Sequence, residues 1–197
     1  MTQSSQIPNA GERQRSNFML WLVLAVCLAP FIAATVLHRY FPPDSRMNFG
    51  ELVEPVPLPN NDLQSLDGKT MQISALRGKW IMVHVDSGVC DAACNDKLWK
   101  IRQLRLTQGK NMERIERLWL VADQTPIDAT LQKEYAGTHI WRAGNEFIRL
   151  LPATNGPHQH IWLIDPLGNV MMRYSRDADP SRIKNDLIRL LKVSQIG

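Results

Sequence analysis

Cys90 and Cys94 are the two residues of this sequence whose type and spacing best suit chemistry. They stand in the run DSGVCDAAC (residues 86–94), between an apolar stretch that predicts a strand and a pattern that predicts a helix. If the helix begins near Cys90, the i, i+4 spacing places both sulfurs on one side of its first turn. Unpaired N–H groups and the positive end of the helix dipole stabilise a thiolate there. A thiol whose pKa is lowered in this way is a better nucleophile and a better metal ligand.

This dithiol permits two chemistries, and the sequence leaves both open. One is a reversible Cys90–Cys94 disulfide that exchanges with a partner. The other is capture of a soft ion such as Cu(I) by two thiolates and one neutral imidazole. A purely structural disulfide is the alternative without chemistry. Zinc is not expected, because a structural zinc site needs about four protein ligands and the third cysteine, Cys27, lies in a long apolar segment.

Three carboxylates accompany the cysteines. Asp86 and Asp123 follow expected strands and are interpreted as surface carboxylates, with proton relays as the alternative. Asp91 lies between the two cysteines, where its negative charge opposes formation of a thiolate.

The elements that must position this pair alternate between strands and helices. Strands are expected over residues 80–85, 115–122, 161–165 and 169–174, and a hairpin turned by Asp67-Gly68 over residues 63–74. Helices are expected from the cysteines to Gly109, from Thr125-Pro126 onward, and after Asp179-Pro180. This order predicts an α/β fold, a thioredoxin-like three-layer sandwich with a mixed sheet and an N-terminal hairpin extension.

Two histidines are well placed to act as a third ligand. His158 and His160 lie in NGPHQH (residues 155–160), directly before an expected strand. Alternation along an extended chain puts both on one face, and in a thioredoxin fold the loop before this strand passes beside the helix that carries the cysteines. A solvated loop is the alternative reading. His84 is in the middle of a strand and is expected to be packed and hydrogen-bonded.

Residues 17–37 contain no charged side chain and predict a membrane-spanning helix. At 1.5 Å per residue this segment spans about 31 Å, which matches the hydrocarbon core of a bilayer. A cleaved signal peptide is the alternative, but residues 38–43 (HRYFPP) do not resemble a cleavage site with small residues. Arg13 and Arg15 favour an N-terminus retained in the cytoplasm.

These features divide the chain into four expected parts. They are a cytoplasmic tail (1–16), a transmembrane helix (17–38) that contacts membrane lipid, a proline-rich linker (39–60) and a periplasmic thioredoxin-like domain (61–197). Proline fixes φ and removes a donor, so the linker is expected to be an extended spacer. The formal net charge is +4, but Lys and Arg are mixed with Asp and Glu along most of the chain, so no nucleic-acid partner is expected.

Residues 60–193 resemble the Sco family of thioredoxin-fold proteins. Cys90 and Cys94 match its CxxxC spacing, which differs from the CxxC of ordinary thioredoxins. The runs LDGK (66–69) and LRGKW (76–80) are similar to its opening hairpin and strand. Further similar runs are VADQTP (121–126), and WLIDP (162–166) with Gly168. The sequence departs from the family in having DAA (91–93) without proline, and in having His158 one residue after the family's histidine position, which falls on Pro157.

The resemblance implies an assembly factor for cytochrome c oxidase on the outer face of a bacterial inner membrane. Such a protein binds Cu(I) through Cys90, Cys94 and His158, with His160 as the alternative, or reduces thiols of the oxidase subunit that carries the copper site. Its partners would be that subunit or other assembly factors. As a reductase, Cys90 would attack and Cys94 would resolve the mixed disulfide. The alternatives are a general periplasmic thiol-disulfide oxidoreductase without metal and a non-catalytic interaction module.

Overall fold

The computed structural model describes residues 10–40, 48–194 and 196, and the chain divides into two compact units after residue 46. In the first unit, helix α1 (Ala10–Tyr40) runs through Pro30. Its segment Phe18–Leu37 is long and apolar enough to cross a membrane and has no buried residue. Of the expected tail and linker, residues 1–9 and 41–47 lie outside the described residues.

The second unit is built on one eight-stranded mixed sheet with the strand order β1-β8-β7-β4-β5-β6-β2-β3. The central strands β4, β5 and β6 are parallel, and every other neighbouring pair is antiparallel. The strands are β1 (Glu51–Pro57), β2 (Leu63–Ser65), β3 (Thr70–Met71), β4 (Trp80–Asp86), β5 (Ile115–Val121), β6 (His139–Arg142), β7 (His160–Ile164) and β8 (Asn169–Ser175).

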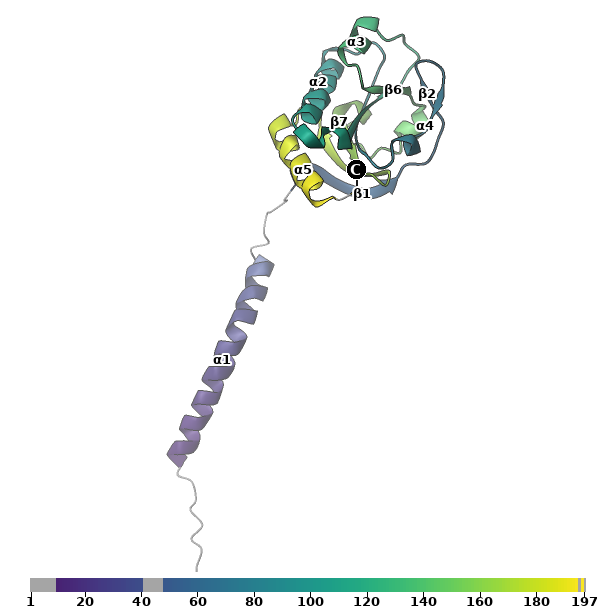
Figure 1. Ribbon diagram of the computed structural model, residues 1–197. Coiled ribbons are helices and arrows are strands. Elements are labelled where there is room, and N and C mark those ends of the chain that lie inside the picture. The colour runs from purple at the N-terminus through teal and green to yellow at the C-terminus, as the bar shows by residue number, and fades with distance from the viewer. Residues whose placement is uncertain (1–9, 41–47, 195, 197) are drawn as a thin grey trace, which may run out of the picture. The chain divides into compact units, whose positions relative to one another are not determined.

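Helices cover both faces of this sheet and complete the three layers. Figure 1 shows α2 (Ala92–Leu106) and α5 (Pro180–Val193) side by side. The remaining helices are α3 (Ala129–Glu134), α4 (Asn145–Ile148) and the 3-10 turns η1 (Ile73–Leu76), η2 (Gly109–Arg114) and η3 (Pro157–Gln159). The predicted thioredoxin-like sandwich and its hairpin are confirmed.

Alternation along the central strands separates two cores. Met82 of β4 and Leu163 of β7 pack with α2 and α5. Val83 and Trp162, one residue away on the same strands, pack with α4 and η1 on the opposite face. Because side chains alternate along a strand, the position of a residue in β7 decides which of the two cores it faces.

The prediction that residues 39–60 form only a spacer was wrong for residues 51–57, which form β1 at the edge of the sheet against β8. Pro55 lies where the pairing register shifts between Leu52 and Val56, and an edge strand tolerates proline at such an irregularity because the missing N–H is not needed there. Asp186, which is buried on α5, anchors the start of this strand by accepting the N–H groups of Phe49 (3.1 Å) and Gly50 (2.8 Å).

One helix start agrees with expectation and one differs. Helix α2 begins at Ala92, because the Asp91 side chain caps it by accepting the N–H of Cys94 at 2.9 Å. Helix α3 begins at Ala129 rather than at Thr125-Pro126, because Asp128 is its N-cap and accepts the N–H of Thr130.

Candidate functional site

Cys90 and Cys94 form a disulfide at the carboxyl end of β4, where the chain enters α2. Their Cα atoms are 5.0 Å apart. Cys94, in the first turn of the helix, is fully buried among Leu98 and Trp119, whereas Cys90 is only partly buried. The structure therefore brings the two predicted thiols together, with one sulfur-bearing residue near solvent and the other inside.

The backbone turn before the helix is specialised for this arrangement. Cys90 has φ +48°, in the left-handed region that costs a non-glycine residue about 1–2 kcal/mol. Gly88 packs so closely that a Cβ there would lie 2.4 Å from the Thr125 carbonyl oxygen. Any larger residue at position 88 would therefore displace the loop that carries Cys90.

Asp123 fastens this loop to the end of β5. Its Oδ1 accepts the N–H groups of Gly88 (3.1 Å) and Thr125 (3.0 Å). A hydrogen bond from the Ser87 side chain, followed by these backbone bonds, lowers the pKa of Asp123 to about 2. Asp123 is thus half-buried and links two loops by hydrogen bonds, rather than being the surface carboxylate that the sequence favoured.

Lys97 is a residue of the site that sequence reasoning missed. Its side chain is 1% exposed, and its Nζ forms an ion pair with Asp86 Oδ2 at 2.6 Å. It also donates to the carbonyl oxygens of Val85 (3.1 Å) and His158 (2.8 Å). Burial lowers the pKa of Lys97, and the Asp86 carboxylate opposes that shift. The sequence did carry a signal, because Lys97 interrupts the buried stripe Cys94, Leu98, Ile101 and Leu104 of α2.

His158 lies beside this cluster. It is part of the turn η3, its side chain is 50% exposed, and its Nδ1 is 3.5 Å from Asp86 Oδ1. Asp86, expected at the surface, therefore lies between Lys97 and His158 and is only 13% exposed. Within the described residues, no three His, Cys, Asp or Glu side chains are arranged to hold a metal ion. The two predicted thiols are joined to each other, and His158 contacts Asp86 and Lys97 rather than a sulfur.

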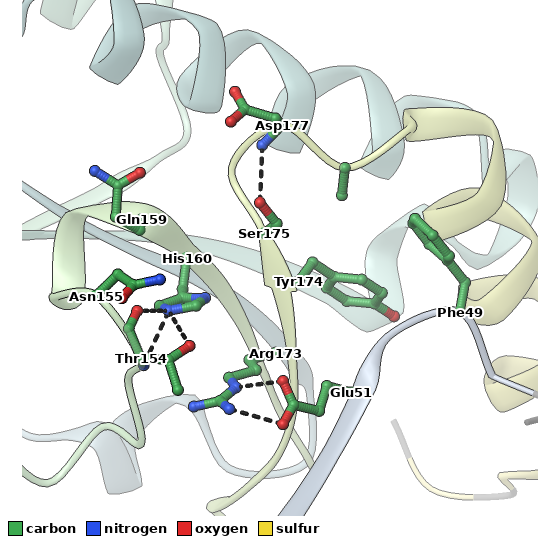
Figure 2. Close-up of a pocket in the computed structure, with 11 residues that line it drawn as sticks. Phe49, Glu51, Thr154, Asn155, Gln159, His160, Arg173, Tyr174, Ser175 and Asp177 are labelled. Carbon is green, nitrogen blue, oxygen red and sulfur yellow. Dashed lines mark hydrogen bonds and ion pairs between the residues drawn. The ribbon is translucent and has the colours of Figure 1, made fainter.

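His160 is placed elsewhere. It is the first residue of β7, and alternation puts it on the face of Trp162, opposite the face covered by α2. Its ring is buried, with Nε2 2.5 Å from the Thr154 carbonyl oxygen. Figure 2 shows it beside Thr154. Both residues line a pocket of about 630 Å³. The expectation that His158 and His160 share a face was wrong, because the η3 turn breaks the strand alternation between them.

His84 is packed but not hydrogen-bonded. It is fully buried in β4 and stacks on Trp119, with ring centroids 5.7 Å apart and planes 20° apart. Neither ring nitrogen has a hydrogen-bond partner within the described part of the chain. Burial, together with the charge of Lys97, holds the pKa of His84 well below its usual 6.5.

The burial of His84 predicts that the domain loses stability in mild acid. The imidazole stays neutral in the folded chain but gains a proton in the unfolded chain below its ordinary pKa, so acid favours unfolding. Between pH 7.5 and 5.5 this effect lowers the free energy of unfolding by about 1.4 kcal/mol. Urea unfolding at the two pH values would measure the loss, with His84→Phe as the control because it keeps a ring on Trp119 and does not titrate. An equal loss in that variant would assign the pH dependence to other groups.

Comparisons with known proteins agree with this fold. A family model described as "Transmembrane-like, thioredoxin-like, C-terminal domain" matches residues 80–194. No curated protein matches the chain. Similar solved structures include yeast Sco1 with copper bound, which is 17% identical with a TM-score of 0.58, the match covering 72% of this chain and 96% of that one.

Two further solved structures share this fold. Apo Sco1 from Thermus thermophilus is 14% identical with a TM-score of 0.54, covering 76% of this chain and 98% of that one. The thioredoxin domain of a thiol-disulfide oxidoreductase from Bacteroides vulgatus is 14% identical with a TM-score of 0.54, covering 72% and 99%. At these identities the likeness establishes the fold, so the predicted thioredoxin-like fold is confirmed.

Proposed function

Because the chain belongs to the family of transmembrane-like, thioredoxin-like C-terminal domains, we propose that it is a membrane-anchored dithiol protein that carries Cu(I). In this proposal it is a Sco-like assembly factor for cytochrome c oxidase, and its cargo is passed to the oxidase subunit that holds the copper site. The observation that carries the proposal is the Cys90–Cys94 pair at the strand-to-helix junction, with His158 in the adjoining cluster.

The copper chemistry requires the reduced pair. An external dithiol supplies two electrons and two protons, opens the Cys90–Cys94 bond and is itself oxidised to a disulfide. The two sulfurs, once deprotonated, and the neutral imidazole of His158 then form a soft ligand set of the kind that Cu(I) prefers. The disulfide form binds no copper through these sulfurs, so the redox state of the pair controls loading.

The proposed location is supported by helix α1 and by the disulfide. Helix α1 anchors the chain in the inner membrane of a bacterium, and the thioredoxin-like domain lies in the periplasm. Disulfides form and persist in that compartment, which agrees with the closed Cys90–Cys94 bond.

A metal-free thiol reductase is the second candidate, and the difference in burial of the two cysteines favours it. Cys90 is partly exposed and Cys94 is fully buried. The Cys90 thiolate would attack a partner disulfide, one partner sulfur would leave as a thiolate, and the Cys94 thiolate would then displace the second partner sulfur from Cys90. The products are a reduced partner and the closed Cys90–Cys94 bond.

A competition titration separates the two candidates. The full chain in detergent is reduced under anaerobic conditions and titrated with Cu(I) against a chelator of known affinity, with the oxidised chain as the control. We expect one tightly bound Cu(I) per reduced chain and none in the oxidised chain. His158→Ala should weaken binding at least tenfold, and His160→Ala should leave it unchanged because His160 lies on the other face of β7. No competitive binding, with a readily reversible disulfide, would leave the reductase as the working function.

A further inference from the structure

We infer that Lys97 is a positioning residue for copper binding, which places His158 relative to the two sulfurs. This inference rests on the proposed Cu(I) site and adds to it a residue that touches neither the metal nor the sulfurs. Lys97 is on α2, three residues after Cys94, so one rigid element carries both the buried cysteine and the buried lysine.

The ammonium group of Lys97 joins three segments of the chain. Its three donors match three acceptors, which are the Asp86 carboxylate and Val85 carbonyl at the end of β4 and the His158 carbonyl in η3. The lengths of 2.6, 3.1 and 2.8 Å are those of well-formed bonds. The group is therefore fully satisfied, and its bonds hold the end of β4 and the turn η3 against α2.

The bond to His158 fixes the backbone of the proposed ligand. The turn that carries His158 is tied at its far end to the chain after β8, because the Gln159 carbonyl accepts the N–H of Arg176 at 2.8 Å. The Lys97 bond to the His158 carbonyl adds a direct connection between this turn and the helix of the cysteines. Without it, the turn keeps its attachment at Gln159 and the contact of His158 with Asp86, but its backbone is no longer bonded to α2.

Lys97 also orients the His158 ring through Asp86. The two oxygens of Asp86 are divided between the partners, with Oδ2 on Lys97 and Oδ1 3.5 Å from His158 Nδ1. A carboxylate facing Nδ1 favours the tautomer with the proton on that nitrogen, which leaves the lone pair of Nε2 for a metal. Carboxylates in this second-layer position commonly fix metal-ligating imidazoles in the same way.

A double-mutant cycle tests the inference on the full chain in detergent, using the Cu(I) competition titration. Lys97→Met keeps the unbranched side chain as far as the ε position and removes the ammonium donors. We expect it to weaken Cu(I) binding by about tenfold to a hundredfold when His158 is present, within the range seen for residues that support metal ligands, and to have little effect in the His158→Ala background. Lys100→Met is the matched control, because Lys100 is a buried lysine of the same helix that binds Asp96 and the Arg176 carbonyl instead of η3.

The outcomes separate this inference from the function on which it rests. If the wild-type chain binds no Cu(I), the proposed function fails and the inference with it. If it binds Cu(I) but Lys97→Met and His158→Ala have independent, additive effects, Lys97 is only a structural ion pair and the inference alone is overturned. Lys97→Gln, which stays polar beside Asp86, keeps the test decisive if Lys97→Met does not fold. Coupling of Lys97→Gln to His158→Ala is expected, and its absence overturns the inference.

Discussion

Replacing Cys90 with serine is expected to weaken Cu(I) binding by about a hundredfold to a thousandfold. A soft ion loses a thiolate and gains at best a hydroxyl oxygen, which it binds poorly. Binding of structural zinc by four ligands of a zinc-finger peptide contributes about 10–16 kcal/mol, so on that scale one lost ligand removes roughly 2.5–4 kcal/mol. Cys94→Ser should have the same effect, because the two sulfurs act together.

The measurement is the anaerobic competition titration of each serine variant beside Cys27→Ser. Cys27 is a free cysteine of α1, within the segment suited to cross a membrane, and its loss should not change the affinity. An affinity that survives Cys90→Ser, or that falls equally with Cys27→Ser, would exclude the dithiol as the copper site.

Trp162→Ala is expected to lower the free energy of unfolding by about 3–5 kcal/mol. Trp162 is fully buried in β7, and its Nε1 donates to the Pro152 carbonyl oxygen at 3.0 Å. Truncation leaves a cavity in the core opposite α2 and an unpaired carbonyl. A domain of this size is stable by only about 5–15 kcal/mol in total, so the variant approaches the limit at which it folds.

Chemical unfolding of Trp162→Ala and Trp99→Ala would measure this effect against a matched control. Trp99 is 48% exposed on α2, and an exposed truncation on a helix changes stability by about 0.5 kcal/mol or less. Similar losses in the two variants would contradict the assignment of Trp162 to a close-packed core.

Much of the fold was predictable because its signals are local. The apolar runs around Trp80 and Ile161 are long and bounded by turn residues, and Asp179-Pro180 is a strong helix start. Strand β6 (His139–Arg142) was not predicted because four residues are too few for a periodic pattern. Strand β1 was missed because Pro55 and Pro57 indicate a spacer, whereas its pairing with β8 depends on residues more than 100 positions away.

The candidate site was likewise predictable only where its signals are local. The proximity of Cys90 and Cys94 was predicted from their spacing within one helical turn, and in the structure the two residues form a disulfide. The sequence could not distinguish the positions of His158 and His160. One 3-10 turn places His158 near Asp86, whereas His160 lies on the face of the sheet opposite α2. Lys97 was missed because its three partners come from β4 and from η3, which lies 61 residues further along the chain.

X-ray absorption on the reduced full chain carrying one Cu(I) tests the central claim most directly, because it counts the atoms bound to copper. The account predicts two sulfurs and one nitrogen, with the nitrogen lost in His158→Ala and retained in His160→Ala. A spectrum without sulfur ligands would contradict copper binding by the Cys90–Cys94 pair, and a nitrogen that persists in His158→Ala would contradict the role of His158.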